Sequence, residues 1–325
     1  MKTWLITGCS SGLGRGIAKA VLRRGDWAAV TARDPAELNT LAQAYPERVL
    51  PLRLDLTDRE SMEQAVHEIC QHFGSIDVLV NNAGHGYPDR GGSFVELYYI
   101  RDADMNLAKI PEGVTLEQAV MVPDMMCTAF EGVQALNMRF GQSVAVLGVG
   151  PVGLMAVRAA VLQGAGNIFA IGSRPVCFDV AKEYGATHLI DYHNDNYIDE
   201  ILQENDGPVD NVVLCGGSEK ELSLGLEMLK NGGTLVNLSA YFSNASIPIQ
   251  PAVWDFGYGD KTIKGVGCGG GRLLLSRMAQ LIAAGRVAPE KLITHRYHGM
   301  DKIPEAMDLF LNHDRSLIKP VIYND

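Results

Sequence analysis

The stretch Val144-Ala145-Val146-Leu147-Gly148-Val149-Gly150-Pro151-Val152-Gly153 decides the fold of most of this chain. Its apolar strand leads directly into a glycine-spaced turn and then into a helix. Gly148 permits the tight turn, Gly150 lets the backbone approach a pyrophosphate, and Gly153 lets the helix pack closely on the strand. The amides at the start of the helix, around Pro151 and Val152, would face the phosphates, and the helix dipole would favour their charge. The stretch therefore predicts a nucleotide-binding turn.

A second apolar strand, Asn167-Ile168-Phe169-Ala170-Ile171, ends in a basic turn about twenty residues further on, where a Rossmann unit meets the adenosine ribose. The turn consists of Gly172, Ser173 and Arg174. An acidic residue there would bind a free 2′-hydroxyl and repel a 2′-phosphate, whereas a guanidinium and a hydroxyl suit the phosphate. The turn favours NADP over NAD, and the alternative is that Arg174 is a solvated turn residue.

Six stretches between about residue 92 and residue 325 match one known family: Asp102-Ala103-Asp104-Met105-Asn106-Leu107-Ala108, Asp124-Met125-Met126, Gly148 to Gly153, Gly172-Ser173-Arg174-Pro175, Lys261-Thr262-Ile263-Lys264-Gly265 and Leu317-Ile318-Lys319. On these residues the chain resembles the medium-chain, zinc-dependent alcohol dehydrogenases, and in particular the NADP-dependent secondary alcohol dehydrogenases of bacteria. The resemblance implies NADP(H) as cofactor and a small secondary alcohol or its ketone as substrate. It implies that Tyr192 joins Ser173 and Arg174 around the 2′-phosphate, that Lys319 lies close to the cofactor, and that the nicotinamide lies near Ser239 and Ala240.

Composition limits the classes of protein to which this chain can belong. A chain of 325 residues with 47% hydrophobic and 20% charged residues is typical of a soluble protein of two or three domains. The net charge of −10 argues against nucleic acid or an anionic membrane as partner. The N-terminus enters a strand directly, without a charged leader and a long apolar run. Six scattered cysteines suit reduced thiols, so we expect a cytoplasmic protein.

Residues 1–87 carry a different nucleotide-binding signature. The run Thr7-Gly8-Cys9-Ser10-Ser11-Gly12-Leu13-Gly14 and the later Asn81-Asn82-Ala83-Gly84 resemble the short-chain dehydrogenases. Hydrophobic periodicity predicts strands near 3–7, 27–32, 48–54 and 77–81, alternating with helices near 13–24, 35–44 and 59–73. The residues of this second, weaker nucleotide site would be Gly8, Ser11, Gly12, Leu13, Gly14, Arg33, Asp55 and Asn81.

Each resemblance stops short of a complete catalytic site. A short-chain dehydrogenase uses a Tyr with a Lys four residues later, whose charge lowers the pKa of the phenol. No Tyr in this chain has such a Lys; Tyr258 and Lys261 are one residue too close. The first module also has only the four strands that hold an adenosine, without those of the nicotinamide half.

The zinc ligands of the second family fall mostly before the point where that resemblance begins, and only Asp124 corresponds to one of them. A catalytic zinc needs about three protein ligands. Cys127 could share a helix face with Asp124, but the alternative is a helix-start acid and a core thiol. His295 and His298 lie on a predicted strand, where we expect them to share one face as structural or surface histidines. These residues do not complete a zinc site, so zinc as a second cofactor is an alternative and not the prediction.

These observations predict an α/β protein with Rossmann-type, doubly wound parallel sheets. We expect a half module at 1–87, a remnant of a GroES-like catalytic domain at 88–138, a complete six-stranded NADP-binding domain at 139–290, and a return to the remnant at 291–325. The turn-rich junction lies at 86–92, and 94–100 would be a strand left over from the catalytic domain.

The predicted activity is reversible NADP(H)-dependent oxidation of a small secondary alcohol to its ketone. Two alternatives remain, a zinc-independent reductase and a catalytically inactive NADP(H)-binding fusion protein. In the medium-chain family the strand at Thr262-Ile263-Lys264 pairs edge to edge with a second subunit, so the resemblance also implies a homo-oligomer.

Overall fold

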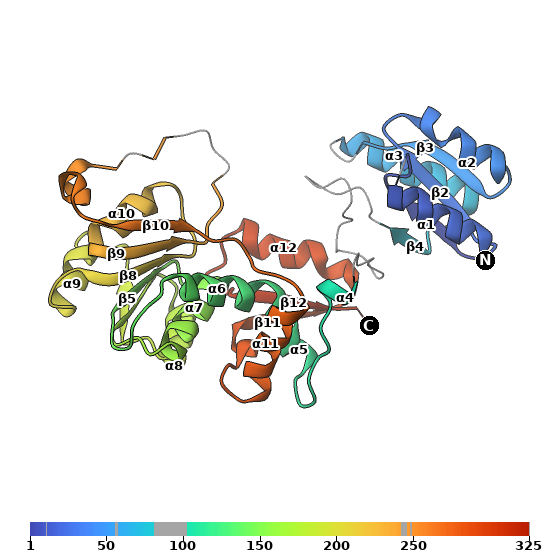
Figure 1. The fold of residues 1–325 in the computed structure, drawn as a ribbon. Helices are drawn as coiled ribbons and strands as arrows, with labels where there is room; N and C mark the ends of the chain where they lie inside the picture. Colours follow the sequence, from blue (N-terminus) through green and yellow to red (C-terminus); the bar gives the residue numbers. More distant parts are fainter. Residues whose placement is uncertain (11, 56–57, 81–102, 242–245, 248, 325) are drawn as a thin grey trace. The chain divides into compact units, whose positions relative to one another are not determined.

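The computed structural model describes residues 1–10, 12–55, 58–80, 103–241, 246–247 and 249–324. The chain forms two compact units, residues 1–101 and 102–325 (Figure 1). The predicted junction at 86–92, the predicted strand at 94–100, and the site residues Ser11 and Asn81 lie outside the described residues.

The N-terminal unit contains a parallel sheet with the strand order β3-β2-β1-β4. Successive residues of its strands point to opposite faces, so Ile6 and Val30 pack with α1 while Leu5 and Ala29 pack with α3. The strands are β1 (Thr3–Ile6), β2 (Trp27–Ala32), β3 (Val49–Arg53) and β4 (Val78–Val80), and the helices are α1 (Gly12–Arg23), η1 (Pro35–Leu38), α2 (Asn39–Ala44) and α3 (Arg59–Phe73). The sheet thus has the order of one half of a Rossmann sheet, as predicted.

The helix expected near 35–44 is divided in two. Asp34 accepts a hydrogen bond from the amide of Ala36, and Pro35 occupies the first position of a 3-10 turn. Only after Leu38 does an α-helix follow. Periodicity cannot distinguish such a capped 3-10 entry from the first turn of an α-helix.

The C-terminal unit is built on the predicted six-stranded parallel sheet, in the order β10-β9-β8-β5-β6-β7. Its strands are β5 (Val144–Leu147), β6 (Ile168–Gly172), β7 (His188–Asp191), β8 (Val209–Leu214), β9 (Leu229–Asn237) and β10 (Thr262–Gly265). The strand order switches between β5 and β8, because β6 and β7 are added on one side of β5, whereas β8, β9 and β10 are added on the other. The carboxyl ends of β5 and β8 flank the crevice in which such sheets bind nucleotides. Within the part of the unit that the structure describes, β10 pairs only with β9 and is an edge strand.

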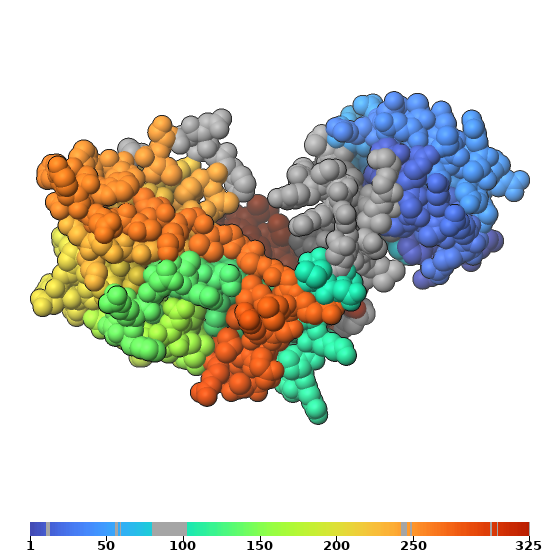
Figure 2. Space-filling model, viewed as in Figure 1, coloured from blue at the N-terminus to red at the C-terminus, as the bar shows by residue number. Residues whose placement is uncertain are grey.

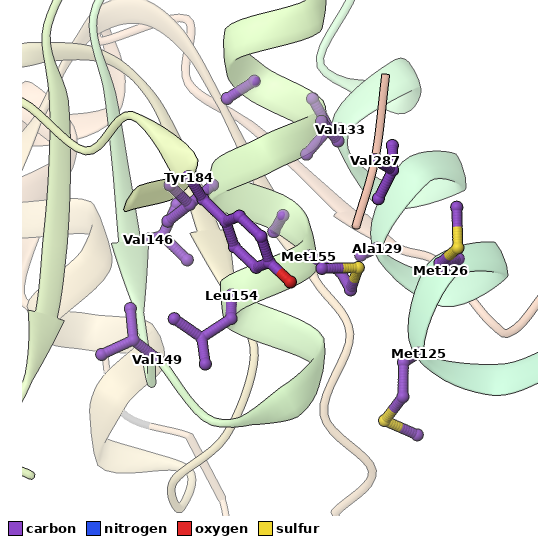
Figure 3. Close-up of a cluster of buried hydrophobic side chains, with 14 of the residues drawn as sticks. Met125, Met126, Ala129, Val133, Val146, Val149, Leu154, Met155, Tyr184 and Val287 are labelled. Atoms are coloured by element: carbon purple, nitrogen blue, oxygen red, sulfur yellow. The ribbon is translucent and has the colours of Figure 1, made fainter. Parts of the chain in front are cut away.

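Helices cover both faces of this sheet. The apolar run after Gly150 becomes α7, which is buried because it lies between the sheet and α6. Figure 3 shows Leu154 and Met155 of α7 in this core, with Val146 of β5, Tyr184 of α8 and Ala129 of α6 around them. On the other face, α9 and α10 cover Ala145 and Leu147. The helices and helical turns are α6 (Cys127–Ala135), α7 (Pro151–Leu162), α8 (Pro175–Tyr184), α9 (Tyr197–Glu204), α10 (Lys220–Met228), η3 (Pro251–Gly257), α11 (Arg272–Ala283) and η4 (Pro289–Leu292).

Segments from before and after the six-stranded sheet meet in a separate layer. Arg272, at the start of α11, donates through Nε to the carbonyl of Leu107 at 2.7 Å. Figure 2 shows the orange surface of α11 beside the teal surface of α4. The elements of this layer are α4 (Ala103–Asn106), α5 (Leu116–Ala119), the π-turn η2 (Val122–Met126), β11 (Ile293–His298), η5 (Met300–Lys302), α12 (Ile303–Leu311) and β12 (Lys319–Tyr323), with β11 and β12 parallel.

An ion-pair cluster joins α5 to the strands β11 and β12. The guanidinium of Arg296 donates to both carboxylate oxygens of Glu117, from Nε at 2.7 Å and from Nη2 at 2.9 Å. The hydroxyl of Tyr323 donates to the same carboxylate. Three segments far apart in the sequence are therefore connected through one carboxylate.

The prediction that His295 and His298 share a face is wrong. The register of β11 on β12 is regular from His295 to His298, so two residues three positions apart point to opposite faces. His295 hydrogen-bonds to Thr294, and the ring of His298 stacks on Tyr323 with the ring centroids 4.7 Å apart.

The Glu117 cluster makes the stability of the C-terminal unit depend on pH. Hydrogen bonds from Arg296 and then Tyr323 lower the pKa of Glu117 from 4.5 to about 2. Because the pKa of Glu117 is lower in the folded state, its carboxylate stabilises the fold fully above about pH 4.5. This stabilisation is lost as the pH falls toward 2. Glu117→Gln should therefore lower the unfolding temperature at pH 7, and the difference from the wild type should shrink between pH 4.5 and pH 3. Thermal unfolding measured by circular dichroism tests this.

The matched control is Glu305→Gln, which removes an exposed pair with Lys302 within one helical turn. Exposed pairs of this kind stabilise little. Equal effects of the two substitutions would show that the Glu117 cluster is no more than a surface pair.

Candidate functional site

A cavity of about 750 Å³ lies at the carboxyl ends of β5 and β6. Three segments line most of it, namely residues 147–151, residues 171–174, and the chain around residues 313–319. The first two are the glycine turn and the basic turn that the sequence identified. The third comes from the layer beside the Rossmann domain, so the cavity needs both parts of the C-terminal unit.

The glycine turn has the geometry of a phosphate cradle. Gly148 has a φ of +90°, and a Cβ on Gly153 would lie 2.1 Å from the carbonyl oxygen of Gly148. By contrast, among the described residues a Cβ on Gly150 would have only Nη2 of Arg174 within 4 Å, at 3.8 Å. Gly150 caps the N-terminus of α7, where Pro151 and Val152 begin the helix and no side chain caps it. Open space over a twelve-residue helix N-terminus fits the pyrophosphate of a dinucleotide.

The basic turn places a hydroxyl pair at the ribose position. A Cβ on Gly172 would lie 2.4 Å from Cγ2 of Val149, so the two turns pack directly on each other. The hydroxyl of Ser173 donates to the hydroxyl of Tyr192 at 3.1 Å, as the medium-chain resemblance implies for a shared 2′-phosphate site. Tyr192 is half exposed and lines the cavity.

Arg174 is not a freely solvated turn residue. It is half-buried, lines the cavity, and donates from Nη1 to the backbone carbonyl of Leu317. Lys319 also lines the cavity, two residues beyond this carbonyl. The structure therefore brings together the turn and the C-terminal lysine that the sequence analysis assigned to NADP(H).

Sequence reasoning missed Arg315. Its Nη2 donates to the backbone carbonyl of Ser173 at 2.5 Å, and its side chain lines the same cavity. The available signal was a second basic residue four positions before Lys319, just ahead of the stretch Leu317-Ile318-Lys319 that matched the family.

Two of the predicted cofactor residues, Ser239 and Ala240, do not line this cavity. They follow β9, where the amide of Ser239 donates to the side chain of Asn237 at 3.1 Å. The hydroxyl of Ser239 is buried and has no hydrogen-bond partner among the described residues.

The surroundings of Asp124 do not fit a catalytic zinc. Asp124 is exposed and accepts a hydrogen bond from the hydroxyl of Thr128 at 3.2 Å. Cys127 is fully buried, which raises the pKa of its thiol to about 12, so it is a core residue that does not share an open face with Asp124. In the described ranges no three His, Cys, Asp or Glu side chains gather closely enough to hold a metal ion.

Tyr258 and Lys261 do not form a catalytic pair. The ammonium group of Lys261 donates to the carbonyl of Leu226 at 2.8 Å, whereas 87% of Tyr258 is exposed.

In the N-terminal unit the described residues of the second predicted site follow the carboxyl ends of their strands. Gly8 follows β1 with a φ of +70°, Arg33 follows β2 and is exposed, and Asp55 follows β3. The backbone of Gly12, Leu13 and Gly14 begins α1. Arg15, which sequence reasoning missed, donates to the carbonyls of Ser10 at 3.1 Å and Glu37 at 3.0 Å and so fixes the turn.

Comparison with known proteins identifies both parts. A family model for zinc-binding dehydrogenases matches residues 151–284, and one for short chain dehydrogenases matches residues 2–103. The NADP-dependent isopropanol dehydrogenase of Clostridium beijerinckii is 42% identical over 234 residues, which are 72% of this chain and 67% of that protein. The corresponding enzyme of Thermoanaerobacter brockii is 43% identical over 72% of this chain and 66% of its own length.

This chain belongs to the zinc-type alcohol dehydrogenase family. The resemblance predicted from the sequence is confirmed for both of its parts, and these relatives are NADP-dependent enzymes. The matched region spans about two thirds of the length of these alcohol dehydrogenases.

Solved structures agree with the fold of an alcohol dehydrogenase. The alcohol dehydrogenase TADH from Thermus sp. ATN1 matches with a TM-score of 0.67 and 30% identity, covering 74% of this chain and 70% of that one. The 2R,3R-butanediol dehydrogenase of Bacillus subtilis shares the fold, with a TM-score of 0.60 and 24% identity over 75% of this chain and 71% of that one.

The donor set around Asp124 leads to a prediction about metal content. A single exposed carboxylate supplies too few ligands for tight zinc binding. We expect less than one zinc per chain after dialysis, and no change in zinc content in Asp124→Ala, measured by elemental analysis. One zinc per chain that is lost in Asp124→Ala would show that further ligands complete the site.

Proposed function

We propose that this protein is an NADP(H)-dependent oxidoreductase of the alcohol dehydrogenase type, which interconverts a small secondary alcohol and its ketone. One observation carries the proposal, the convergence of the Gly150 cradle with Ser173, Arg174, Tyr192 and Lys319 on one cavity. The relatives named isopropanol dehydrogenases support the substrate class.

When bound, NADP(H) would supply or accept the hydride of the carbon that bears the substrate oxygen, with a proton joining or leaving that oxygen. The residues of this chain bind and orient the cofactor. The N-terminus of α7 attracts the pyrophosphate, and the packing of Gly172 against Val149 fixes the ribose turn relative to it. Arg174 then distinguishes a 2′-phosphate from a hydroxyl by its charge.

Calorimetric titration of three variants tests the cofactor assignment. Arg174→Ala should weaken NADPH binding by roughly ten- to a hundredfold, because a charged donor is lost, and leave NADH nearly unchanged. Gly150→Asp should abolish binding of both cofactors, because its carboxylate would occupy the space of the pyrophosphate. The nearest group to that position is a side-chain nitrogen of Arg174, so the variant should still fold.

The control is Gly12→Asp in the N-terminal unit, which should have little effect on either cofactor. If Gly12→Asp removes NADPH binding and Gly150→Asp does not, the function belongs to the other unit.

A second candidate is an NADP(H)-binding protein without turnover, and it is favoured because no further metal-ligating side chains gather around Asp124 among the described residues. Reduction of a ketone needs a group that polarises its carbonyl, which zinc supplies in alcohol dehydrogenases. A zinc-independent reductase acting on activated double bonds is the remaining alternative within the enzymes.

Turnover assays separate these candidates. With isopropanol and NADP⁺, or acetone and NADPH, we expect a saturable change in absorbance at the nicotinamide band that Gly150→Asp abolishes. NADPH binding without turnover would instead support the second candidate. Reduction of an α,β-unsaturated ketone at its double bond by NADPH, in a sample without zinc, would support the metal-independent reductase.

The edge strand β10 and the reduced thiols support two further parts of the proposal. An open parallel edge favours pairing with a second copy, so we propose a homodimer or larger homo-oligomer, which light scattering at micromolar concentration would detect. None of the cysteines is in a disulfide, which suits a cytoplasmic location. No described helix is long and apolar enough to cross a bilayer.

A further inference from the structure

We propose that Arg315 is a second guanidinium for the 2′-phosphate of NADP(H) and strengthens the preference over NAD(H). This inference rests on the proposed binding of NADP(H) to the C-terminal unit. It assigns a role to a residue outside the Gly-Ser-Arg turn, Tyr192 and Lys319.

Two arginines connect the basic turn and the C-terminal segment in opposite directions. Arg174, in the turn, donates to the carbonyl of Leu317, while Arg315 donates to the carbonyl of Ser173. Ser173 is also the residue whose hydroxyl donates to Tyr192. The guanidinium of Arg315 is therefore one hydrogen bond away from the backbone of the residue that faces the 2′-position. A guanidinium has five donors, so this bond leaves others for a phosphate.

A tight turn holds Arg315 in place. The carboxylate of Asp314 accepts hydrogen bonds from the amide of Ser316 at 2.8 Å and from its hydroxyl at 2.5 Å. The amide of Leu317 donates to the carbonyl of Asp314 at 3.2 Å. The amide of Ile318 then donates to the hydroxyl of Thr294 on β11 at 3.0 Å. The position from which Arg315 extends is thus fixed from within the turn and from the neighbouring strand.

The charges of the cavity wall agree with a ligand that carries more than one negative charge near the basic turn and Arg315. Three cations line the cavity, Arg174, Arg315 and Lys319. Its two carboxylates, Asp314 and Glu221, are engaged with neighbouring serines, Asp314 with Ser316 and Glu221 with Ser218. Arg174 shares one of its donors with Leu317, so a phosphate dianion between the turn and the segment suits two guanidiniums better than one.

The test is calorimetric titration of the full chain with NADPH, NADH and 2′,5′-ADP. Arg315→Ala should weaken NADPH and 2′,5′-ADP by about tenfold and leave NADH within about twofold, since only the 2′-phosphate contact is lost. Arg277→Ala, which removes an exposed arginine from α11 outside the cavity, is the matched control and should change none of the three.

Arg315→Gln separates charge from structure. Glutamine keeps an amide donor but carries no charge, so it should lose NADPH affinity as alanine does, whereas Arg315→Lys, which keeps the charge and most of the length, should retain part of it. Glutamine with wild-type affinity, or an equal loss of NADPH and NADH in Arg315→Ala, would show that Arg315 only holds the turn and would overturn the inference.

The titration of the wild type distinguishes failure of the proposed NADP(H) function from failure of the role proposed for Arg315. If the wild type binds neither NADPH nor 2′,5′-ADP, the proposed function fails and the role of Arg315 fails with it. If the wild type binds both and Arg315→Ala binds them equally well, only the inference about Arg315 fails. Circular dichroism of each variant verifies the fold, and the conservative Gln and Lys variants decide the outcome if the alanine variant does not fold.

Discussion

The contact between α7 and the carbonyl of Gly148 is the constraint on which the C-terminal unit depends. A methyl group on Gly153 would lie 2.1 Å from that oxygen, so only glycine allows the helix to start so close to its strand. Because α7 starts so close to the strand, Leu154 and Met155 pack in the core between the sheet and α6. The N-terminus of the helix then faces open space at Gly150. One backbone contact therefore determines both the packing of the domain and the place where a negative charge is stabilised.

The two units illustrate that binding and chemistry depend on different parts of these folds. Each has strands in the order of the adenosine half of a Rossmann sheet, because the strand, turn and helix of that half are local in sequence. Catalysis depends on side chains that distant segments bring together. Around Asp124 the described part of the chain offers Thr128 as a hydrogen-bond partner and a buried thiol, which stabilise local structure rather than activate a carbonyl.

The sequence predicted the architecture well, for a physical reason. Continuous apolar runs such as Val144 to Leu147 are unambiguous for buried parallel strands, and glycine spacing marks where each strand turns into a helix. It did not predict Arg315, because its contact with Ser173 spans 142 residues and no periodicity links the two. The faces of His295 and His298 were mistaken because three residues is an odd step on a strand, which alternates with a period of two. Local patterns thus predicted the elements and two turns of the cavity wall, whereas only the tertiary contacts revealed Arg315.

The bond between Arg174 and Leu317 has a consequence for the order in which the protein acquires its structure during synthesis. The two residues are 143 positions apart, so the wall of the nucleotide cavity cannot close until the ribosome has added the whole of that interval. At typical elongation rates this takes on the order of ten seconds. During this time β5, β6 and α7 have been synthesised, while Arg174 does not yet have the carbonyl of Leu317 as its partner. The nascent chain therefore has a nucleotide-binding turn well before it has a complete nucleotide-binding cavity.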